Sequence, residues 1–186
     1  MKSVTIIWCD WGDDDTALLQ EIWKNLPASV SVQLVHLTRW DSVSEKIVEL
    51  AIKDESDTLL FCGHGTKHGL LAPRRLTEYV IHQENAGLIK AETVIGLTCY
   101  GKEFAKSVGL HGLFSGMFIS NYSEACDYAI SNTSDAEIVE SNRAFFVEFS
   151  KVLSGESSCE ECLERIKSLK FRDPVSAFNA EEMEIL

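Results

Sequence analysis

Short apolar runs alternate along this chain with windows in which apolar residues recur at helical spacing. Alternating or β-branched runs predict five strands, at Ser3–Cys9, Val30–Leu37, Thr58–Cys62, Thr93–Thr98 and Leu113–Ile119. Helical spacing predicts helices at Asp13–Leu26, Ser42–Ala51, Leu76–Glu84 and Glu103–Val108, followed by two closing helices that carry Phe145–Leu153 and Cys159–Leu169. Strands that alternate with helices form βαβ units, so we predict a three-layer α/β/α fold with a mostly parallel central sheet.

The pattern also predicts where the folded part ends and which helix faces pack inward. Beyond Phe171 the chain is acidic, so we expect a single domain over residues 1–171 and a loose acidic tail over residues 172–186. A capping box at Ser42–Glu45 opens a helix that carries Val43, Ile47, Leu50 and Ala51 on one side.

Composition and charge exclude several classes of protein. The 186 residues are 45% apolar and 25% charged, as in an ordinary folded domain. The net charge of −12 argues against a nucleic-acid or anionic-membrane surface, because phosphate binding needs a basic footprint. No apolar run approaches the ~18 residues of a membrane span. The six cysteines form no disulfide framework, so we expect reduced thiols and a cytoplasmic location.

Two strand ends carry residues with catalytic chemistry. His64 follows the apolar run Leu59–Cys62, and Cys99 follows the next predicted strand. The strands of a parallel sheet present their carboxyl ends at one edge, so the imidazole and the thiol come close if these two strands are neighbours. A thiol beside an imidazole is the minimum set for nucleophilic acyl transfer. Gly65 lets the backbone approach a substrate carbonyl, so its N–H and that of Cys99 are the expected oxyanion hole.

The order of these two residues in the chain excludes several families of cysteine enzymes. Papain-like proteases and class I glutaminases carry the Cys before the His, and no nucleophile-elbow motif surrounds Cys99. The segments His64-Gly65 and Thr98-Cys99-Tyr100-Gly101, with the helical stretch Ala144–Ser157, resemble the caspase-like cysteine peptidase superfamily, and most of all its bacterial CHAT group. The resemblance covers roughly Thr58 to Lys167 and implies a caspase-like fold with a catalytic His64–Cys99 pair and no cofactor or metal.

The chain departs from the CHAT group after the fifth predicted strand. Ile119–Ser123 stands where the group usually carries a Trp-Pro-Val-Asp-like segment, so the wall of the substrate pocket does not transfer. The chain shows no sensor or repeat domain of the kind that often accompanies these domains. It is therefore expected to act alone or with a separately encoded regulatory partner.

Carboxylates after the first predicted strand suggest a specificity. Asp10 and Asp13 lie on a loop that should border the His64–Cys99 pair, whereas Asp14 and Asp15 are expected simply to favour the positive end of a helix. A carboxylate beside the scissile bond selects a cationic side chain. We therefore expect Asp10 and Asp13 to bind Lys or Arg, and cleavage to follow that residue.

The predicted function is a cysteine endopeptidase that acts on protein or peptide substrates. A catalytically silent caspase-like scaffold or binding protein is the main alternative. A receiver-like module would need a phosphorylatable Asp where His64 stands. The spacing of Cys62, His64 and His68 suggests a zinc site that lacks a convincing fourth ligand, and Cys159-x-x-Cys162 lies on an apolar helical stripe that favours core packing.

Overall fold

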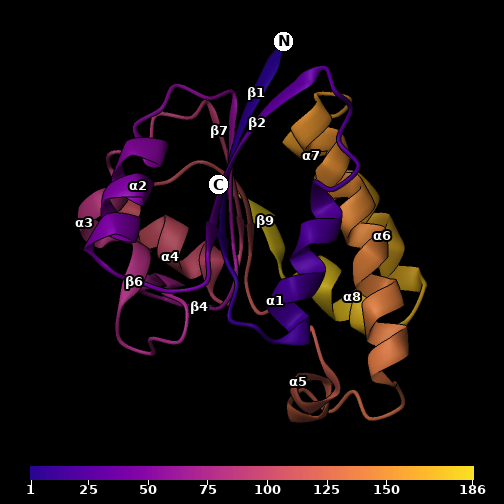
Figure 1. Cartoon of the computed structure of the whole chain (residues 1–186). Helices are drawn as coiled ribbons and strands as arrows, with labels where there is room; N and C mark the ends of the chain where they lie inside the picture. The colour runs from indigo at the N-terminus through magenta and orange to yellow at the C-terminus, as the bar shows by residue number, and fades with distance from the viewer.

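A six-stranded sheet runs through the centre of the computed structural model, which describes all 186 residues (Figure 1). The strands lie in the order β2-β1-β3-β7-β8-β9. Neighbouring strands pair in parallel except β9, which is antiparallel to β8. Their bounds are β1 (Lys2–Cys9), β2 (Val30–Leu37), β3 (Thr58–Cys62), β7 (Thr93–Leu97), β8 (Gly112–Ser115) and β9 (Met183–Ile185).

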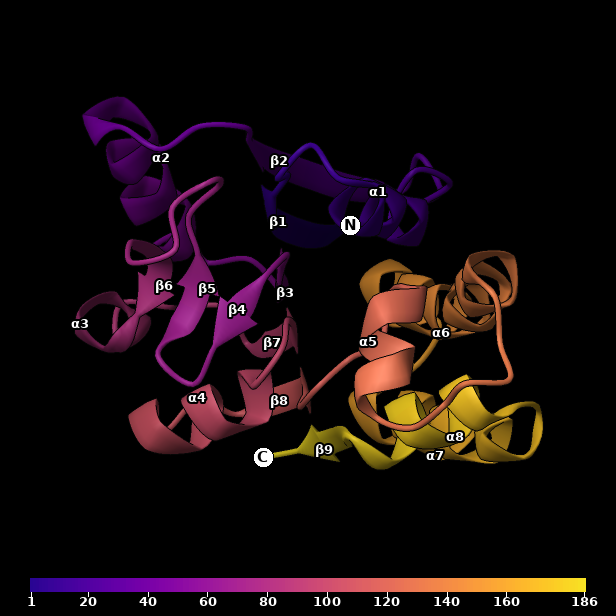
Figure 2. The ribbon, with the colours of Figure 1, turned by 90° about the horizontal axis from the view of Figure 1, so that it is seen from below.

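Helices cover both faces of this sheet, as the α/β/α prediction requires (Figures 1 and 2). One layer contains α1 (Asp14–Leu18), the 3-10 helix η1 (Leu19–Ile22), α6 (Asp135–Ser154), α7 (Cys159–Ser168) and α8 (Pro174–Glu181). The other contains α2 (Ser42–Ile52), α3 (Gln83–Ala86), α4 (Gly101–Val108) and a small antiparallel sheet of β4 (Gly65–Thr66), β5 (Gly69–Leu71) and β6 (Tyr79–His82). The short α5 (Tyr122–Asp127) follows β8, and η2 (Leu169–Phe171) precedes α8. None of these helices combines the length and the apolar character that a membrane span needs.

The central strands are apolar on both faces because both faces are covered. In β1, Ile6 and Trp8 pack toward α1, α6 and α7, while Ile7 and Cys9 pack toward α2 and the small sheet. All five residues of β3 are buried. A strand with two buried faces appears in the sequence as a continuous apolar run, which is why these strands were predictable.

Some predicted bounds need correction. The second and third strands match the prediction, but the fifth strand ends at Ser115 rather than at Ile119. The first helix begins at Asp14, ends at Leu18 and continues only as η1 to Ile22. The helix predicted at Leu76–Glu84 is wrong, because Val80 and Ile81 lie in β6 and only the short α3 follows.

The Ser42–Ala51 helix is confirmed as α2, but of the four residues assigned to its apolar side only Ala51 is buried. Val43, Ile47 and Leu50 are 63%, 46% and 63% exposed. The helix begins one residue after Asp41, whose carboxylate accepts hydrogen bonds from the N–H groups of the first turn. Its buried face instead carries residues at another phase of the helix, namely Ser44, Val48, Ala51 and Ile52.

Residues 172–186, which were expected to form a loose tail, are folded onto the sheet. They form α8 and β9, in which Val175 and Met183 are 1% and 2% exposed. The acidic character that suggested a tail is neutralised locally, since Glu182 pairs with Lys102 of α4 at 2.7 Å. The domain therefore extends through β9 instead of ending at residue 171.

A buried amide network ties α8 to the segment after β8. The side chain of Asn179 accepts a hydrogen bond from the Ile119 N–H at 2.8 Å and donates to Asn142 at 3.0 Å. Replacing Asn179 with alanine should lower the free energy of unfolding by about 2–4 kcal/mol, because buried polar groups lose their partners. Chemical denaturation would measure this, with exposed Asn25→Ala as a control that changes little. An equal loss in both variants would contradict the assignment.

Candidate active site

The ends of two neighbouring strands bring His64 and Cys99 together. β3 and β7 pair in parallel over their whole length, with Cys62 opposite Leu97. His64 and Cys99 follow these ends by two residues each and line the same narrow cavity, whose volume is about 40 Å³. The adjacency that the sequence analysis required between the two strands is therefore present.

The backbone at Cys99 turns sharply from strand into helix. Tyr100 adopts a left-handed conformation (φ 59°), and α4 begins at the next residue. The N–H of Tyr100 donates to the Gly116 carbonyl at 3.0 Å, whereas the N–H of Cys99 makes no hydrogen bond to an oxygen or nitrogen of the chain. The partner of this N–H is the sulfur of its own residue.

Gly65 lies against the same turn. A Cβ built at Gly65 would stand 1.9 Å from the Thr98 Oγ1 and 3.0 Å from the Cys99 carbonyl oxygen. Any other residue there would displace the Thr98 side chain and press on the backbone after β7. Thr98 is 3% exposed and its hydroxyl has no hydrogen-bond partner. Gly65 and Cys99, the two residues expected to form an oxyanion hole, are thus in close contact.

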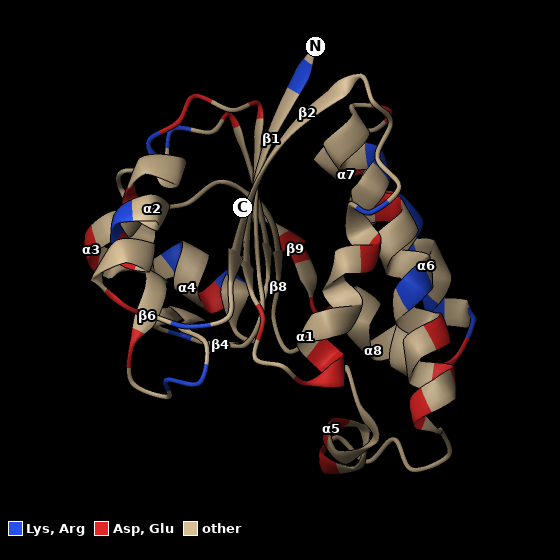
Figure 3. Cartoon of the chain, in the orientation of Figure 1, with Lys and Arg blue, Asp and Glu red and all other residues tan.

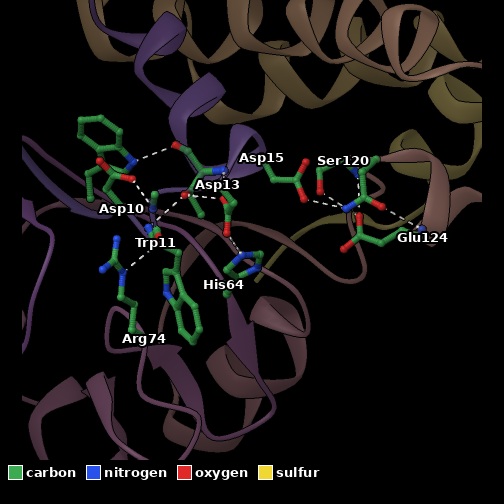
Figure 4. A network of polar contacts seen from close by, with 12 residues as sticks. Asp10, Trp11, Asp13, Asp15, His64, Arg74, Ser120 and Glu124 are labelled. Carbon is green, nitrogen blue, oxygen red and sulfur yellow. Dashed lines mark hydrogen bonds and ion pairs between the residues drawn. The ribbon is translucent and has the colours of Figure 1, made fainter.

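His64 is held from the loop after β1. Its Nε2 lies 2.9 Å from the Asp13 carboxylate, and the Trp11 and His64 rings pack edge to face with their centroids 5.1 Å apart (Figure 4). The His64 carbonyl accepts from the N–H of Leu71 in β5, which anchors the residue from its other side. The ring of His64 is therefore held by the loop after β1, and its backbone by β5.

Asp13 has a second task, because it also caps the N-terminus of α1. Its carboxylate accepts from the Thr16 N–H at 2.8 Å and the Thr16 hydroxyl at 2.6 Å. Burial acts to raise the pKa of Asp13, but hydrogen bonds from Thr16 and His64 outweigh it, so the pKa lies below its usual value. Asp13 is therefore a carboxylate at neutral pH.

An ionised Asp13 determines the form of the His64 ring. A carboxylate can only accept, so the Nε2 of His64 carries the hydrogen. In the neutral imidazole the other nitrogen, Nδ1, then has a free lone pair. His64 thus has one nitrogen fixed by Asp13 and one that can accept a proton.

The Cys99 thiol is half-buried and protonated at neutral pH. Burial raises its pKa to about 11, and the nearby charges of Glu124 and Asp15 act in the same direction. Hydrogen bonds from the backbone N–H groups of Phe118 and of Cys99 itself oppose this rise. A thiol in this state needs a base to become a nucleophile.

The carboxylates beside the thiol differ from those predicted. Asp15 and Glu124 line the cavity with Cys99, whereas neither Asp10 nor Asp13 does. Asp10 pairs instead with His36 at 2.9 Å, and Asp13 with His64. The geometry therefore gives no support to a substrate-binding role for Asp10 and Asp13.

Two neighbouring contacts hold the cavity carboxylates in place (Figure 4). Asp15 accepts from the side chain of Asn121 at 2.6 Å, and Glu124 accepts from the N–H and hydroxyl of Ser120. Sequence reasoning assigned Asp15 only to the first turn of a helix and did not single out Glu124. A usable signal was the Asn121–Glu124 spacing, which is typical of a capped helix start after β8.

The remaining thiols and candidate ligands lie elsewhere. Cys62 is fully buried, and no group of three or more His, Cys, Asp or Glu side chains is arranged to hold a metal ion. Cys159 and Cys162 are buried on the inner face of α7, as predicted. Cys126 of α5 is the exposed thiol. No family model matches the chain, and no curated protein matches it in sequence.

Proposed function

We propose that the protein is a cysteine endopeptidase in which Cys99 is the nucleophile, His64 the general base and acid, and Asp13 a positioning residue. The observation that carries this proposal is that His64, oriented by Asp13 at 2.9 Å, lines the same cavity as the Cys99 thiol. A strand that ends in His-Gly beside a strand that ends in Cys is also what the resemblance to the caspase-like superfamily leads us to expect. Acyl transfer needs this set of groups and no cofactor.

In the first step His64 activates the thiol. Because the pKa of Cys99 is about 11, little thiolate exists beforehand, and the Nδ1 lone pair of His64 must accept the proton as the sulfur attacks. A C–S bond forms to the substrate carbonyl carbon, whose π electrons move to oxygen. The negative oxygen that results accepts hydrogen bonds from the N–H of Gly65 and from the N–H of Cys99, which then no longer donates to its own sulfur.

In the second step the tetrahedral intermediate collapses. The C–N bond breaks as His64 gives its proton to the leaving amine, which leaves a thioester on Cys99. A water molecule then attacks the thioester and loses its proton to His64. The C–S bond then breaks, which releases the carboxylic acid product, and the proton on His64 returns to the sulfur, so the thiol and the imidazole are regenerated and one peptide bond has been hydrolysed.

A specificity for Lys or Arg before the scissile bond follows from the cavity carboxylates. Asp15 and Glu124 lie beside the thiol, and a cationic side chain would gain charge-assisted hydrogen bonds from them. An acidic side chain would meet repulsion in the same place. We therefore assign the binding of the cationic side chain to Asp15 and Glu124 instead of Asp10 and Asp13.

The narrow cavity favours a second candidate function. A cavity of about 40 Å³ is too small for a lysine side chain, and the pKa of Cys99 is raised rather than lowered. Both observations are compatible with a catalytically silent scaffold. Under our proposal they describe a resting state, in which the cavity is closed. Binding of the substrate or of a separately encoded regulatory partner must then widen the cavity.

A peptide electrophile separates the two functions. A lysyl acyloxymethyl ketone should alkylate Cys99 faster than Cys126, although Cys126 is the more exposed thiol, because only Cys99 has a base and a carboxylate-lined pocket beside it. Iodoacetamide, which uses no pocket, should instead favour Cys126. Peptide mass mapping reads out both reactions. Modification of Cys126 alone by the peptide reagent would support the scaffold function and overturn ours.

Replacing Asp13 with asparagine tests its positioning role. The amide can donate to Nε2 and so favour the wrong tautomer of His64, and we expect kcat to fall by about 10²–10⁴-fold with little change in KM. Steady-state kinetics with a fluorogenic lysyl peptide would measure this. A fall confined to KM would contradict the role, because it would place Asp13 in substrate binding.

The same variant has a pH signature in stability. The pKa of Asp13 is lowered in the folded state, so its contribution to stability is present above its unfolded pKa of about 3.9 and is lost as the pH falls through the lower folded value. Wild type should therefore exceed Asp13→Asn in stability at neutral pH, and the difference should shrink below about pH 4. A difference that is independent of pH would assign the loss to helix capping alone.

A further inference from the structure

The outer edge of β2 has no partner in the chain. β2 is the last strand on its side of the sheet, and its eight residues pair only with β1 (Figure 2). Ser31 to Leu34 are all exposed, with Val32 at 40% and Leu34 at 44%. Backbone N–H and C=O groups along such an edge point into solvent, ready to pair with another strand.

This edge lacks the usual protection against pairing. Natural edge strands carry Lys, Pro, inward charges or bulges, or they are very short. β2 has no charged residue and no proline, in a chain that is 25% charged, and its register with β1 is continuous (Figure 3). The opposite edge strand, β9, is protected in this sense, because it has three residues and carries Glu184.

An apolar stripe on α2 flanks the same edge. Val43, Ile47 and Leu50 are exposed and lie at helical spacing. Glu45 and Glu49 line a cavity between α2 and β6, so they face the middle of the domain. The stripe lies on the opposite flank of the helix, which is the side of the β2 edge.

We propose that this surface binds a second copy of the same chain, through antiparallel pairing of the two β2 strands about a two-fold axis normal to the sheet. Such an axis keeps each helix layer on its own side. It therefore places α2 beside its counterpart, apolar stripe against apolar stripe, above the strand pair. The surface is self-complementary, as a two-fold interface requires.

Area and charge both favour this occupant. An eight-residue strand is about 26 Å long, and the sheet with one helix layer is about 20 Å thick, so each copy would bury on the order of 500 Å². The total of about 1,000 Å² reaches the lower bound for a specific interface. The net charge of −12 disfavours other contacts between copies, but the β2 edge and the stripe carry none of that charge.

Sedimentation of the full chain over a range of concentrations tests the proposal. We expect a reversible dimer that strengthens as salt screens the repulsion between two anionic copies. Leu34→Lys and Leu50→Lys should each raise the dimer dissociation constant by at least about tenfold, because each buries a lysine twice per dimer. Val147→Lys on α6, where valine is 53% exposed, is the matched control and should leave the dimer intact.

Hydrogen exchange keeps the proposal testable if a variant fails to fold. In wild type, amides of β2 should become more protected as the protein concentration rises, while amides of β9 should not change. A chain that stays monomeric at several hundred micromolar would overturn the proposal. So would a dimer that survives both lysine variants, or a β2 edge whose exchange does not depend on concentration.

Discussion

Replacing Cys99 with alanine should lower kcat/KM for a lysyl peptide amide by at least about 1,000-fold, because no other thiol lines the cavity. His64→Ala should cost a similar factor. The double variant should lose little more than either single one, since a nucleophile and its base act as a unit. Cleavage of a fluorogenic peptide, with far-UV circular dichroism to check folding, would measure these effects.

The matched control for this prediction is Cys126→Ser. Cys126 is exposed on α5 and does not line the cavity, so its loss should leave kcat/KM within about twofold of wild type. Activity that persists in Cys99→Ala would exclude the proposed nucleophile. A folded wild type that cleaves no peptide, with or without a partner protein, would favour the scaffold function instead.

The second large effect concerns charge selectivity. Asp15→Asn combined with Glu124→Gln should reduce kcat/KM for cleavage after Lys by at least about 10- to 150-fold, which is the effect of losing a single charge-assisted hydrogen bond worth about 1.5–3 kcal/mol. Cleavage after an uncharged residue should change much less. A library of fluorogenic peptides that differ only at that substrate position would separate the two.

Asp14→Asn gives the control for this experiment. Asp14 lies in the same first helical turn as Asp15 but is exposed and does not line the cavity. Its replacement removes one negative charge, as each of the two pocket substitutions does, and should leave the preference for Lys unchanged. If the double variant retains the preference for Lys while Cys99→Ala is inactive, the activity stands and the pocket assignment is wrong.

The parallel core of the fold was predictable because each of its strands has a clear signature in its own stretch of sequence. Thr58–Cys62 is buried on both faces, and a continuous apolar run between polar turns can hardly be anything else. The β6 strand was not predictable in this way. Its Val80 and Ile81 are buried by β5 and the helices of that layer, and their spacing from Leu76 also fits a helix.

The C-terminal elements were missed because their stabilising partners are distant in sequence. Glu182 and Glu184 look like the charges of a solvated tail, yet they pair with Lys102 and Lys106 of α4. The ion pairs join positions 80 and 78 residues apart, which no local pattern contains. The buried apolar residues of α8, such as Val175, are too few to produce a helical pattern that outweighs the acidic composition of this segment.

The candidate site likewise contains residues that the sequence could predict and residues that it could not. His64 and Cys99 stand at strand ends, so topology alone predicts that they meet at one edge of the sheet. Which aspartate orients His64 depends on how far the chain turns between β1 and α1, and several carboxylates in succession leave that open. Glu124 belongs to a short helix after β8 whose position depends on packing against α6 and α8, so sequence reasoning had no means to place it.

The antiparallel strand β9 also bears on when the site is completed during synthesis. Met183–Ile185 covers the edge of β8, and the carbonyl of Glu182 accepts from the N–H of Gly116, in the turn that leads to Phe118 beside the Cys99 thiol. A ribosome releases these residues last among those of the sheet, so a nascent chain can contain His64 and Cys99 long before the wall beside them is supported. We therefore expect the surroundings of the Cys99 thiol to reach their final structure only once β9 has paired with β8.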